Sequence, residues 1–340
     1  MPEYRVTTDA SSLPTERQTF MVDGTVPGWT PQPDDRGWDH HAPGGAPIQI
    51  DGMPQPARAP LLDELSNGKP AQIVTPAVDA DACVAAAYLQ LAPQDLAAVR
   101  DRLAAIAWDC DHLGVPEYLS AWADFAAQAV ATLKAESQAI AKRLNLPADR
   151  RQWTHEQKQT YASTCFQQET NGLLQAARGK CPWPGEQGEA REYWQQVQRD
   201  RRELAERISL LQGVPLFDLR GVHRYVDPRA LLQALRDRYV HAPSPYTLAI
   251  YDRPDGWGYT LGSDPMHPEV SQLDYTQGTF EALRQAEVAK LGQPPTDSWG
   301  GRATVGGSGR NTASVLTPQE VVATVQQGGF GRPNRLTPQH

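Results

Sequence analysis

A short apolar run followed by an alanine-rich helical stretch is the feature that most limits how this chain can fold. The run contains Ile73 and Val74, a turn follows at Pro76, and VDADACVAAAYLQL then continues with a helical composition. Apolar residues recur at helical spacing from Leu96 to Ile106. Because strands that alternate with helices form parallel sheets covered by helices, the sequence predicts an α/β architecture with an N-terminal parallel sheet.

The overall charge and the apolar pattern exclude several classes of protein. The 340 residues include 40 acidic and 32 basic ones, a formal net charge of −8, which argues against a main role in coating nucleic acid or membranes. No apolar run reaches the roughly 18 residues of a membrane span, and the N-terminal segment lacks the apolar block of a signal peptide. The four cysteines contain no C-x-x-C pair, so neither a disulfide scaffold nor a zinc ribbon is indicated. We therefore expect a soluble, cytoplasmic protein without a membrane partner; the oligomeric state is left open.

Composition divides the chain into three segments. Residues 1–149 are predicted to form a metal-binding α/β domain, and within them the Pro-, Gly- and Asp-rich residues 24–60 are expected to be irregular. The polar, glutamine-rich residues 150–214 are predicted to form a helical connector. Residues 215–340 are predicted to form a smaller α/β domain that binds substrate.

The last segment contains clear local signals. Asp227 and Pro228 predict the start of a helix, as N-cap and first helical residue. The alternating pattern of residues 246–263 predicts a hairpin. Gly292 predicts the end of a second helix, and Thr317 the start of a third.

Acidic and histidine residues cluster at the ends of apolar runs and in turns of the N-terminal segment. They are Asp23, Asp39, His40, His41, Asp79, Asp81, Asp109, Asp111 and His112. Strand ends are where open α/β sheets usually bind their ligands. Purely structural alternatives remain: a turn for Asp23, a helix N-cap for Asp79, and a solvated helix end for residues 109–112.

The combination of residue types indicates a metal site. Several carboxylates with one or two imidazoles are the ligand set of Mn²⁺, Mg²⁺ or Co²⁺, whereas softer ions call for thiolates. Two such ions about 3.5–4 Å apart can activate water for an in-line displacement at phosphorus. The sequence leaves open whether one or two ions bind.

A glycine-rich stretch near the C-terminus, residues 297–314, indicates an anion site. Its glycines, including Gly306 and Gly307, allow backbone N–H groups close to an anion, and Arg302 and Arg310 can contact phosphate oxygens. The alternative is a flexible connection. The stretch is neither a P-loop nor a dinucleotide-binding G-x-G-x-x-G motif.

Taken together, these motifs resemble those of the DHH phosphoesterase superfamily, whose members are two-domain, metal-dependent phosphohydrolases. The triplet Asp39-His40-His41 is similar to the one that names the family, and VDADAC to its D-x-D motif. AIAWDCDHLGV looks like a later Asp motif. WGGRATVGGSGR looks like the glycine-rich motif of the family's second, DHH-associated domain.

The resemblance implies a role for each matching residue. The implied metal ligands are Asp23, His40, Asp79, Asp81 and Asp109, with Asp111 as the second choice after Asp109. The implied catalytic residues are His41, facing the substrate phosphate, and Asp39, orienting the histidines. The implied substrate-binding residues, across an interdomain cleft, are Arg302, Gly306, Gly307, Ser308 and Arg310.

The predicted function is a divalent-metal-dependent phosphohydrolase that cleaves a phosphodiester or phosphoanhydride of unknown identity, with nucleic acid possible only as a substrate. The alternative is a binding or regulatory protein of the same fold with weakened chemistry. Three features favour that alternative. The D-x-D-like motif follows the triplet instead of preceding it, Thr75 stands where the family motif carries a histidine, and the polar residues 150–213 offer a surface for a partner. A nucleic-acid-binding surface formed by Trp153, Trp183 and Trp194 with neighbouring basic residues is a third hypothesis, for which a solvated helical face is the structural alternative.

Overall fold

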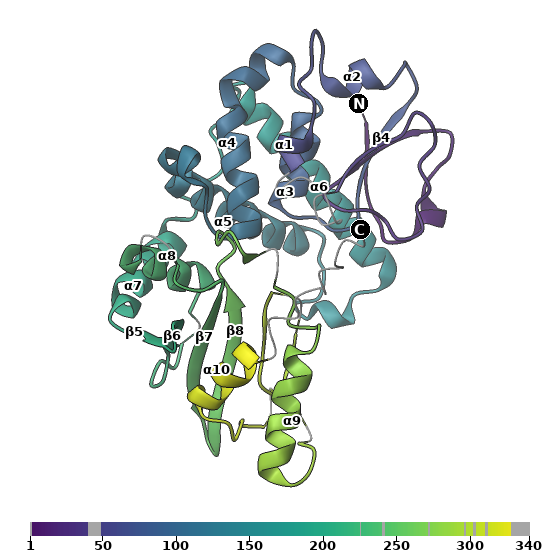
Figure 1. The fold of residues 1–340 in the computed structure, drawn as a ribbon. Helices are drawn as coiled ribbons and strands as arrows, with labels where there is room; N and C mark the ends of the chain where they lie inside the picture. Colours follow the sequence, from purple (N-terminus) through teal and green to yellow (C-terminus); the bar gives the residue numbers. More distant parts are fainter. Residues whose placement is uncertain are drawn as a thin grey trace, which may run out of the picture. The chain divides into compact units, whose positions relative to one another are not determined.

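The computed structural model describes residues 2–39, 49–224, 226–239, 242–270, 273–295, 297–301, 304–309 and 312–327, without the side chains of residues 49, 51 and 151. The chain forms two compact units, Met1–Trp194 and Gln195–His340, which Figure 1 colours from purple through green to yellow. Within the described part of the chain, no helix combines the length and apolarity required of a membrane span.

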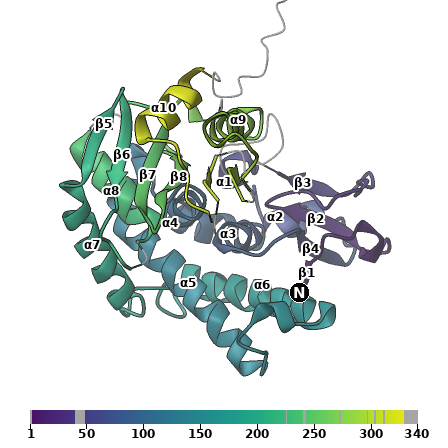
Figure 2. The same ribbon diagram turned by 90° about the horizontal axis from the view of Figure 1, so that it is seen from below.

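The first unit contains a four-stranded sheet in which every pair of neighbours is parallel, as the sequence predicts. Its strands are β1 (Glu3–Val6), β2 (Gln18–Val22), β3 (Arg36–Trp38) and β4 (Ala71–Thr75), in the order β1-β4-β2-β3. Figure 2 shows these strands side by side. Because all neighbouring strands are parallel, the carboxyl ends of β2, β3 and β4 share one edge, although β4 is the last of the four in sequence.

Helices occupy most of the rest of the first unit. They are α1 (Gln49–Gly52), α2 (Leu61–Leu65), α3 (Ala80–Tyr88), α4 (Pro93–His112), α5 (Ala123–Arg143), α6 (His155–Ala177) and α7 (Arg191–Ala205), with 3-10 turns at Ala10–Ser12, Glu117–Trp122 and Arg150–Gln152. Helix α7 crosses the boundary between the two units. The predicted connector, residues 150–214, contains α6, which packs against α3 and β1.

The alternation of side chains along the strands explains how the sheet is covered. Phe20 and Ile73 belong to a large core shared with α3, α4 and α6. Met21 and Val74, one residue further along, form a smaller cluster with Val26. Since successive strand residues point to opposite faces, both faces of the sheet are apolar and buried, as is usual for parallel sheets.

Helix α3 is the centre of this core. All nine of its residues are buried, and it packs against both α4 and α6. Its alanines, such as Ala82 and Ala86, allow these helices to approach closely. A helix that is apolar all round must be enclosed on every side, and the alanine-rich sequence is therefore typical of this position.

The second unit contains a six-stranded mixed sheet with the order β5-β6-β7-β8-β10-β9. Its elements are β5 (Ile208–Leu211), β6 (Val214–Asp218), α8 (Pro228–Arg238), β7 (Tyr246–Arg253), β8 (Gly256–Ser263), α9 (Thr279–Leu291), β9 (Gly300–Gly301), β10 (Gly306–Gly307) and α10 (Pro318–Gln327). Strands β6 and β7 are parallel and connected through α8, and the other pairs are antiparallel.

The local signals of this unit are confirmed. The Asp227 side chain accepts a hydrogen bond from the Arg229 N–H at the start of α8. Strands β7 and β8 form the predicted hairpin. Gly292 ends α9 in the left-handed conformation, and the Thr317 hydroxyl accepts a hydrogen bond from the Glu320 N–H at the start of α10.

One expectation for the first unit is wrong in part. Residues 24–60 were expected to be irregular, but β3 lies within them, and so do the described residues of α1. Strand β3 is only three residues long and contains a single large apolar residue, Trp38. Its pairing with β2 therefore decides its conformation, and this is a long-range contact that local composition does not reveal.

Candidate metal centre

Two of the predicted acidic residues directly follow neighbouring parallel strands. Asp23 comes immediately after β2, and Asp39 immediately after β3. The register pairs Val22 with Trp38, so the two aspartates leave the same edge of the sheet. Asp23 has a left-handed backbone conformation with φ 52°, which turns the chain sharply at the strand end. This carboxyl edge is where α/β sheets place ligands.

The start of helix α3 brings two more carboxylates to this region. Asp79 is the N-cap, and its Oδ1 accepts a hydrogen bond from the Ala82 N–H at 3.0 Å. The structural alternative for Asp79, a helix cap, is thus present in the fold, and it is compatible with a second role for the same side chain. Asp81 lies in the first turn and is fully buried.

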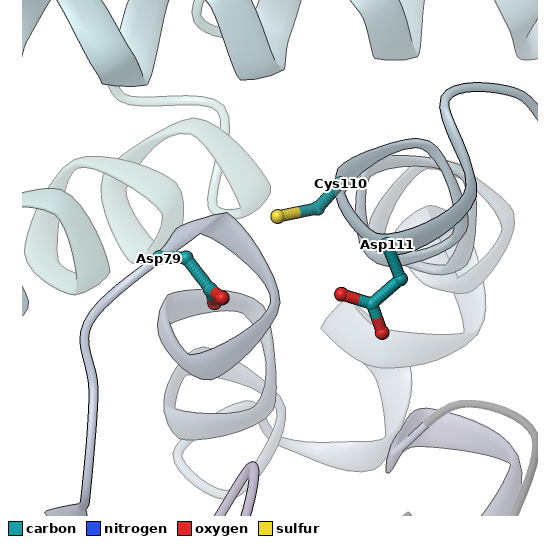
Figure 3. Close-up of side chains that lie close together, drawn as sticks. All are labelled: Asp79, Cys110 and Asp111. Carbon is teal, nitrogen blue, oxygen red and sulfur yellow. The ribbon is translucent and has the colours of Figure 1, made fainter. Parts of the chain in front are cut away.

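The end of helix α4 completes the cluster. One ligand atom from each of Asp79, Cys110 and Asp111 lies within 4.8 Å of the others. Figure 3 shows the Cys110 thiol and the Asp111 carboxylate projecting from α4 toward the first turn of α3. Asp79 is exposed, while Cys110 and Asp111 are half-buried, so the group lies where a core helix reaches the surface.

The electrostatics show how closely the carboxylates gather. Asp79 is exposed as a whole residue, but protein atoms surround its carboxyl group. This burial of the carboxyl group, and then the negative charge of Asp23, raise the pKa of Asp79 to about 7. Burial, followed by the charges of Asp111, Asp23 and Asp79, raises the pKa of Asp81 well above its usual range. Like charges that are forced together disfavour the ionised form. The carboxylates of Asp23, Asp79 and Asp111 thus lie near enough for their charges to raise the pKa of a neighbour, and a divalent cation held by Asp79 and Asp111 would offset this repulsion.

Asp109 lies elsewhere on the same helix. It is 1 % exposed, and at about 100° per residue it points roughly 200° away from Asp111. The structure therefore brings the second choice, Asp111, and not Asp109, next to Asp79. His112, the last residue of α4, packs its ring against Trp108 at 4.6 Å between ring centroids.

The predicted triplet is only partly described. Asp39 accepts a hydrogen bond from the Thr25 hydroxyl at 2.6 Å. His40 and His41 lie outside the described residues, so the predictions for them, a metal ligand and a substrate contact, stay predictions.

The glycine-rich stretch belongs to the second unit. Gly306 and Gly307 form β10, between β8 and β9, whereas Arg302 and Arg310 lie outside the described residues. A Cβ at Gly306 would lie 2.3 Å from Phe280 Cζ, and one at Gly307 would lie 2.5 Å from the Tyr259 carbonyl oxygen. Packing within the sheet thus already requires glycine at both positions, and the proposed anion contact stays a prediction.

The surroundings of β10 are held by buried polar groups. The Ser308 hydroxyl accepts a hydrogen bond from the Tyr259 N–H, and the Ser308 N–H donates to the Tyr259 carbonyl. Glu287, which is 3 % exposed, accepts hydrogen bonds from Trp299 Nε1 and from the hydroxyls of Ser298 and Ser314. These contacts fix both ends of the glycine-rich stretch on α9 and β8.

Two of the three tryptophans of the third hypothesis are core residues, and the third, Trp194, is half-buried. Trp153 is 6 % exposed and packs edge-on against Tyr161, and Trp183 is 5 % exposed and packs against Phe125. Neither ring is available to stack on a base, which favours the structural alternative.

The donor atoms of the cluster fit a divalent cation. Carboxylate oxygens bind hard and borderline ions, and a thiol that loses its proton binds borderline and soft ones. Asp79, Asp111 and Cys110 would hold the ion, and the negative charge of Asp23 acts on Asp79.

Cys110 is the site residue that sequence reasoning missed. The cysteines were considered only for C-x-x-C spacing, although Cys110 lies between two candidate ligands in WDCDH. The sequence also contained evidence that Asp109 is buried. Asp109 follows Leu103 and Ile106 at the same three-residue spacing, so it lies on the apolar face of the helix.

Comparisons with known proteins give distant likenesses only. No family model matches the chain, and no curated protein matches it. A pGpG-specific phosphodiesterase from Vibrio cholerae is similar with 12 % identity and a TM-score of 0.29, over 48 % of this chain and 48 % of that one. An exopolyphosphatase-related protein from Bacteroides fragilis is similar with 9 % identity and a TM-score of 0.27, over 92 % and 91 %. At these scores the likenesses are too weak to assign a family.

Proposed function

We propose that this chain is a divalent-metal-dependent phosphohydrolase, related in design to the DHH phosphoesterases, that cleaves a phosphodiester or a phosphoanhydride. The observation that supports it most strongly is the convergence of Asp79, Cys110 and Asp111 at the carboxyl edge of the parallel sheet. The choice of a phosphate substrate rests on the sequence motifs, above all on the resemblance to the DHH triplet and the D-x-D motif.

The acidic residues of the cluster have separate roles in this proposal. Asp79 and Asp111 hold the cation from two different helices, and Asp23 contributes negative charge from the end of β2. When bound, the cation supplies positive charge to a phosphoryl oxygen and makes an attacking water more acidic.

A second candidate is a binding or regulatory protein of the same design with little turnover. Thr75 favours it. This residue ends β4, is fully buried, and donates its hydroxyl hydrogen bond to the Ala77 carbonyl oxygen at 2.5 Å. No imidazole is therefore supplied from the end of β4, where the family motif would carry one.

The first prediction concerns Asp79. The purified 340-residue protein, supplied with Mn²⁺ or Zn²⁺, should hydrolyse at least one of four substrates: a generic phosphodiester or an oligonucleotide, cleaved to a phosphomonoester and an alcohol, or pyrophosphate or polyphosphate, cleaved with release of inorganic phosphate. Asp79→Asn should lower this activity at least about 100-fold, since even the outer partners of metal ligands contribute 10–100-fold. Asparagine still caps a helix, so α3 should remain folded.

A matched control is Asp101→Asn, which removes the same charge from an exposed position on α4. It should retain full activity. Metal-dependent hydrolysis that survives Asp79→Asn would contradict the proposed site. Metal binding without hydrolysis of any of the four substrates would favour the second candidate, a binding or regulatory protein.

A further inference from the structure

The thiol of Cys110 is unusual in a cluster that otherwise consists of carboxylates. We propose that Cys110 is itself a ligand of the divalent ion, and that it makes the site select an ion of the Zn²⁺ or Co²⁺ class over Mg²⁺. This inference rests on the metal site of the proposed function, but it concerns which ion binds and through which atoms, not whether a phosphate is cleaved.

The Cys110 sulfur lies close to carboxylate oxygens of both Asp79 and Asp111. Sγ of Cys110 and one carboxylate oxygen each of Asp79 and Asp111 lie within 4.8 Å of one another. Ligand atoms around a tetrahedral Zn²⁺ lie roughly 3.5 Å apart, from bond lengths of about 2.0 Å to oxygen and 2.3 Å to sulfur. A movement of the three ligand atoms by about 1 Å, through rotation of these exposed or half-buried side chains, would therefore bring them to the spacing of a Zn²⁺ site.

The chemistry of the sulfur determines the choice of ion. On binding, the S–H bond breaks, the proton passes to solvent, and the sulfur electron pair forms the bond to the cation. Mg²⁺ prefers an octahedral set of oxygens, and a given site of nitrogen, oxygen or sulfur ligands binds Mn²⁺ more weakly than Co²⁺ or Zn²⁺. One thiolate together with carboxylates thus favours the borderline ions, in contrast to the oxygen and imidazole set expected from the sequence.

The other cysteines provide a built-in comparison. Cys181 is exposed and lies close to the Gly172 carbonyl. Cys83 is fully buried, with its thiol toward Glu169. Neither belongs to the group of ligand atoms that includes Cys110, so a change at Cys181 tests for non-specific thiol binding.

The test is a titration of the metal-free, full-length protein with Co²⁺, followed by absorption spectroscopy. We expect a sulfur-to-cobalt charge-transfer band in the near ultraviolet, bleached by one equivalent of Zn²⁺ per bound Co²⁺ but not by excess Mg²⁺. Cys110→Ser should abolish the band and weaken Zn²⁺ binding at least about 100-fold, because outer partners alone contribute 10–100-fold. Cys181→Ser should leave both unchanged.

A second measurement on the unmodified protein does not depend on the folding of a variant. Zn²⁺ should protect Cys110 from alkylation by iodoacetamide, as mapped by mass spectrometry, and should leave Cys181 reactive. Bound Co²⁺ without the charge-transfer band, a band that survives Cys110→Ser, or Mg²⁺ displacing Zn²⁺ would each overturn the inference while leaving a metal-dependent hydrolase in place. No uptake of any divalent ion would overturn the metal site and the proposed function together.

Discussion

At the scale of single residues, the first unit contains a buried acid that the proposed chemistry does not use. Glu169 on α6 is 3 % exposed; it accepts a hydrogen bond from the Ser137 hydroxyl, and its other oxygen faces the Cys83 thiol. Burial raises the pKa of Glu169 to about 7, although both hydrogen bonds act to lower it. The carboxyl group is therefore packed like a core side chain and retains its proton well above the pH at which an unfolded chain would lose it.

This burial predicts a specific dependence of stability on pH. Between about pH 4.5 and 7 the native state holds the Glu169 proton while the unfolded state has lost it, so the free energy of unfolding falls as the pH rises. From a pKa of about 7 against an ordinary value of 4.5, the loss is about 3 kcal/mol, at 1.36 kcal/mol per unit. Glu169→Gln should remove this part of the decline, as measured by urea unfolding at several pH values.

Glu156→Gln is the matched control, because it removes an exposed carboxylate from the same helix. Its pH profile should follow that of the unmodified protein. A Glu169→Gln profile that falls as steeply as that of the unmodified protein would show that Glu169 is ionised in the native state.

At the scale of elements, the glycine hairpin of β9 and β10 shows how packing restricts sequence. The two strands pair Gly306 with Gly301 and Gly307 with Gly300. Gly306 faces the ring of Phe280, a buried residue of α9, and the carbonyl oxygen of Gly300. A side chain at Gly306 would force the hairpin away from the helix, whereas Gly300 has space beside it.

We therefore expect opposite outcomes for two alanine substitutions in this hairpin. Gly306→Ala introduces a Cβ only 2.3 Å from Phe280 Cζ and 2.6 Å from the Gly300 carbonyl oxygen. It should destabilise the second unit by about 1–3 kcal/mol, the usual cost of overpacking.

Gly300→Ala places its Cβ 3.9 Å from the Arg284 side chain and should change the free energy of unfolding by less than about 0.5 kcal/mol. Equal effects of the two changes in chemical denaturation would show that the contact with α9 does not restrict this hairpin.

At the scale of the whole molecule, each unit has a large hydrophobic core of its own. One contains β2, β4 and α3 of the first unit, and the other contains β7, β8 and α10 of the second. The proposed ion-binding residues all belong to the first unit. A ligand stabilises the folded state to which it binds. We therefore expect the ion to stabilise the first unit more than the second.

Hydrogen exchange measured by mass spectrometry can check this. Saturating Zn²⁺ should slow exchange in peptides of α3 and of the last turns of α4, because the ion connects these two helices. Peptides of the β7–β8 hairpin, residues 246–263, should change little. Protection of the hairpin equal to that of α3 would contradict a site confined to the first unit, and Asp79→Asn should abolish the protection of α3.

Local signals in the sequence were sufficient for much of this fold. Asp227 with Pro228 marked the start of α8, and the alternation in residues 246–263 marked a hairpin, because caps, turns and periodicity act over a few residues. The same kind of signal placed Asp23 and Asp79 at the ends of apolar runs.

Only the tertiary structure decided which side chains meet. The order β1-β4-β2-β3 brings the ends of three strands to one edge, although β4 is more than thirty residues beyond β3 in the sequence. The packing of α4 against α3 then turns Asp111 and Cys110 toward Asp79 and leaves Asp109 in the interior. A sequence fixes the chemistry that each residue carries, but strand order and helix rotation depend on contacts between distant segments, and these determine which groups can share an ion.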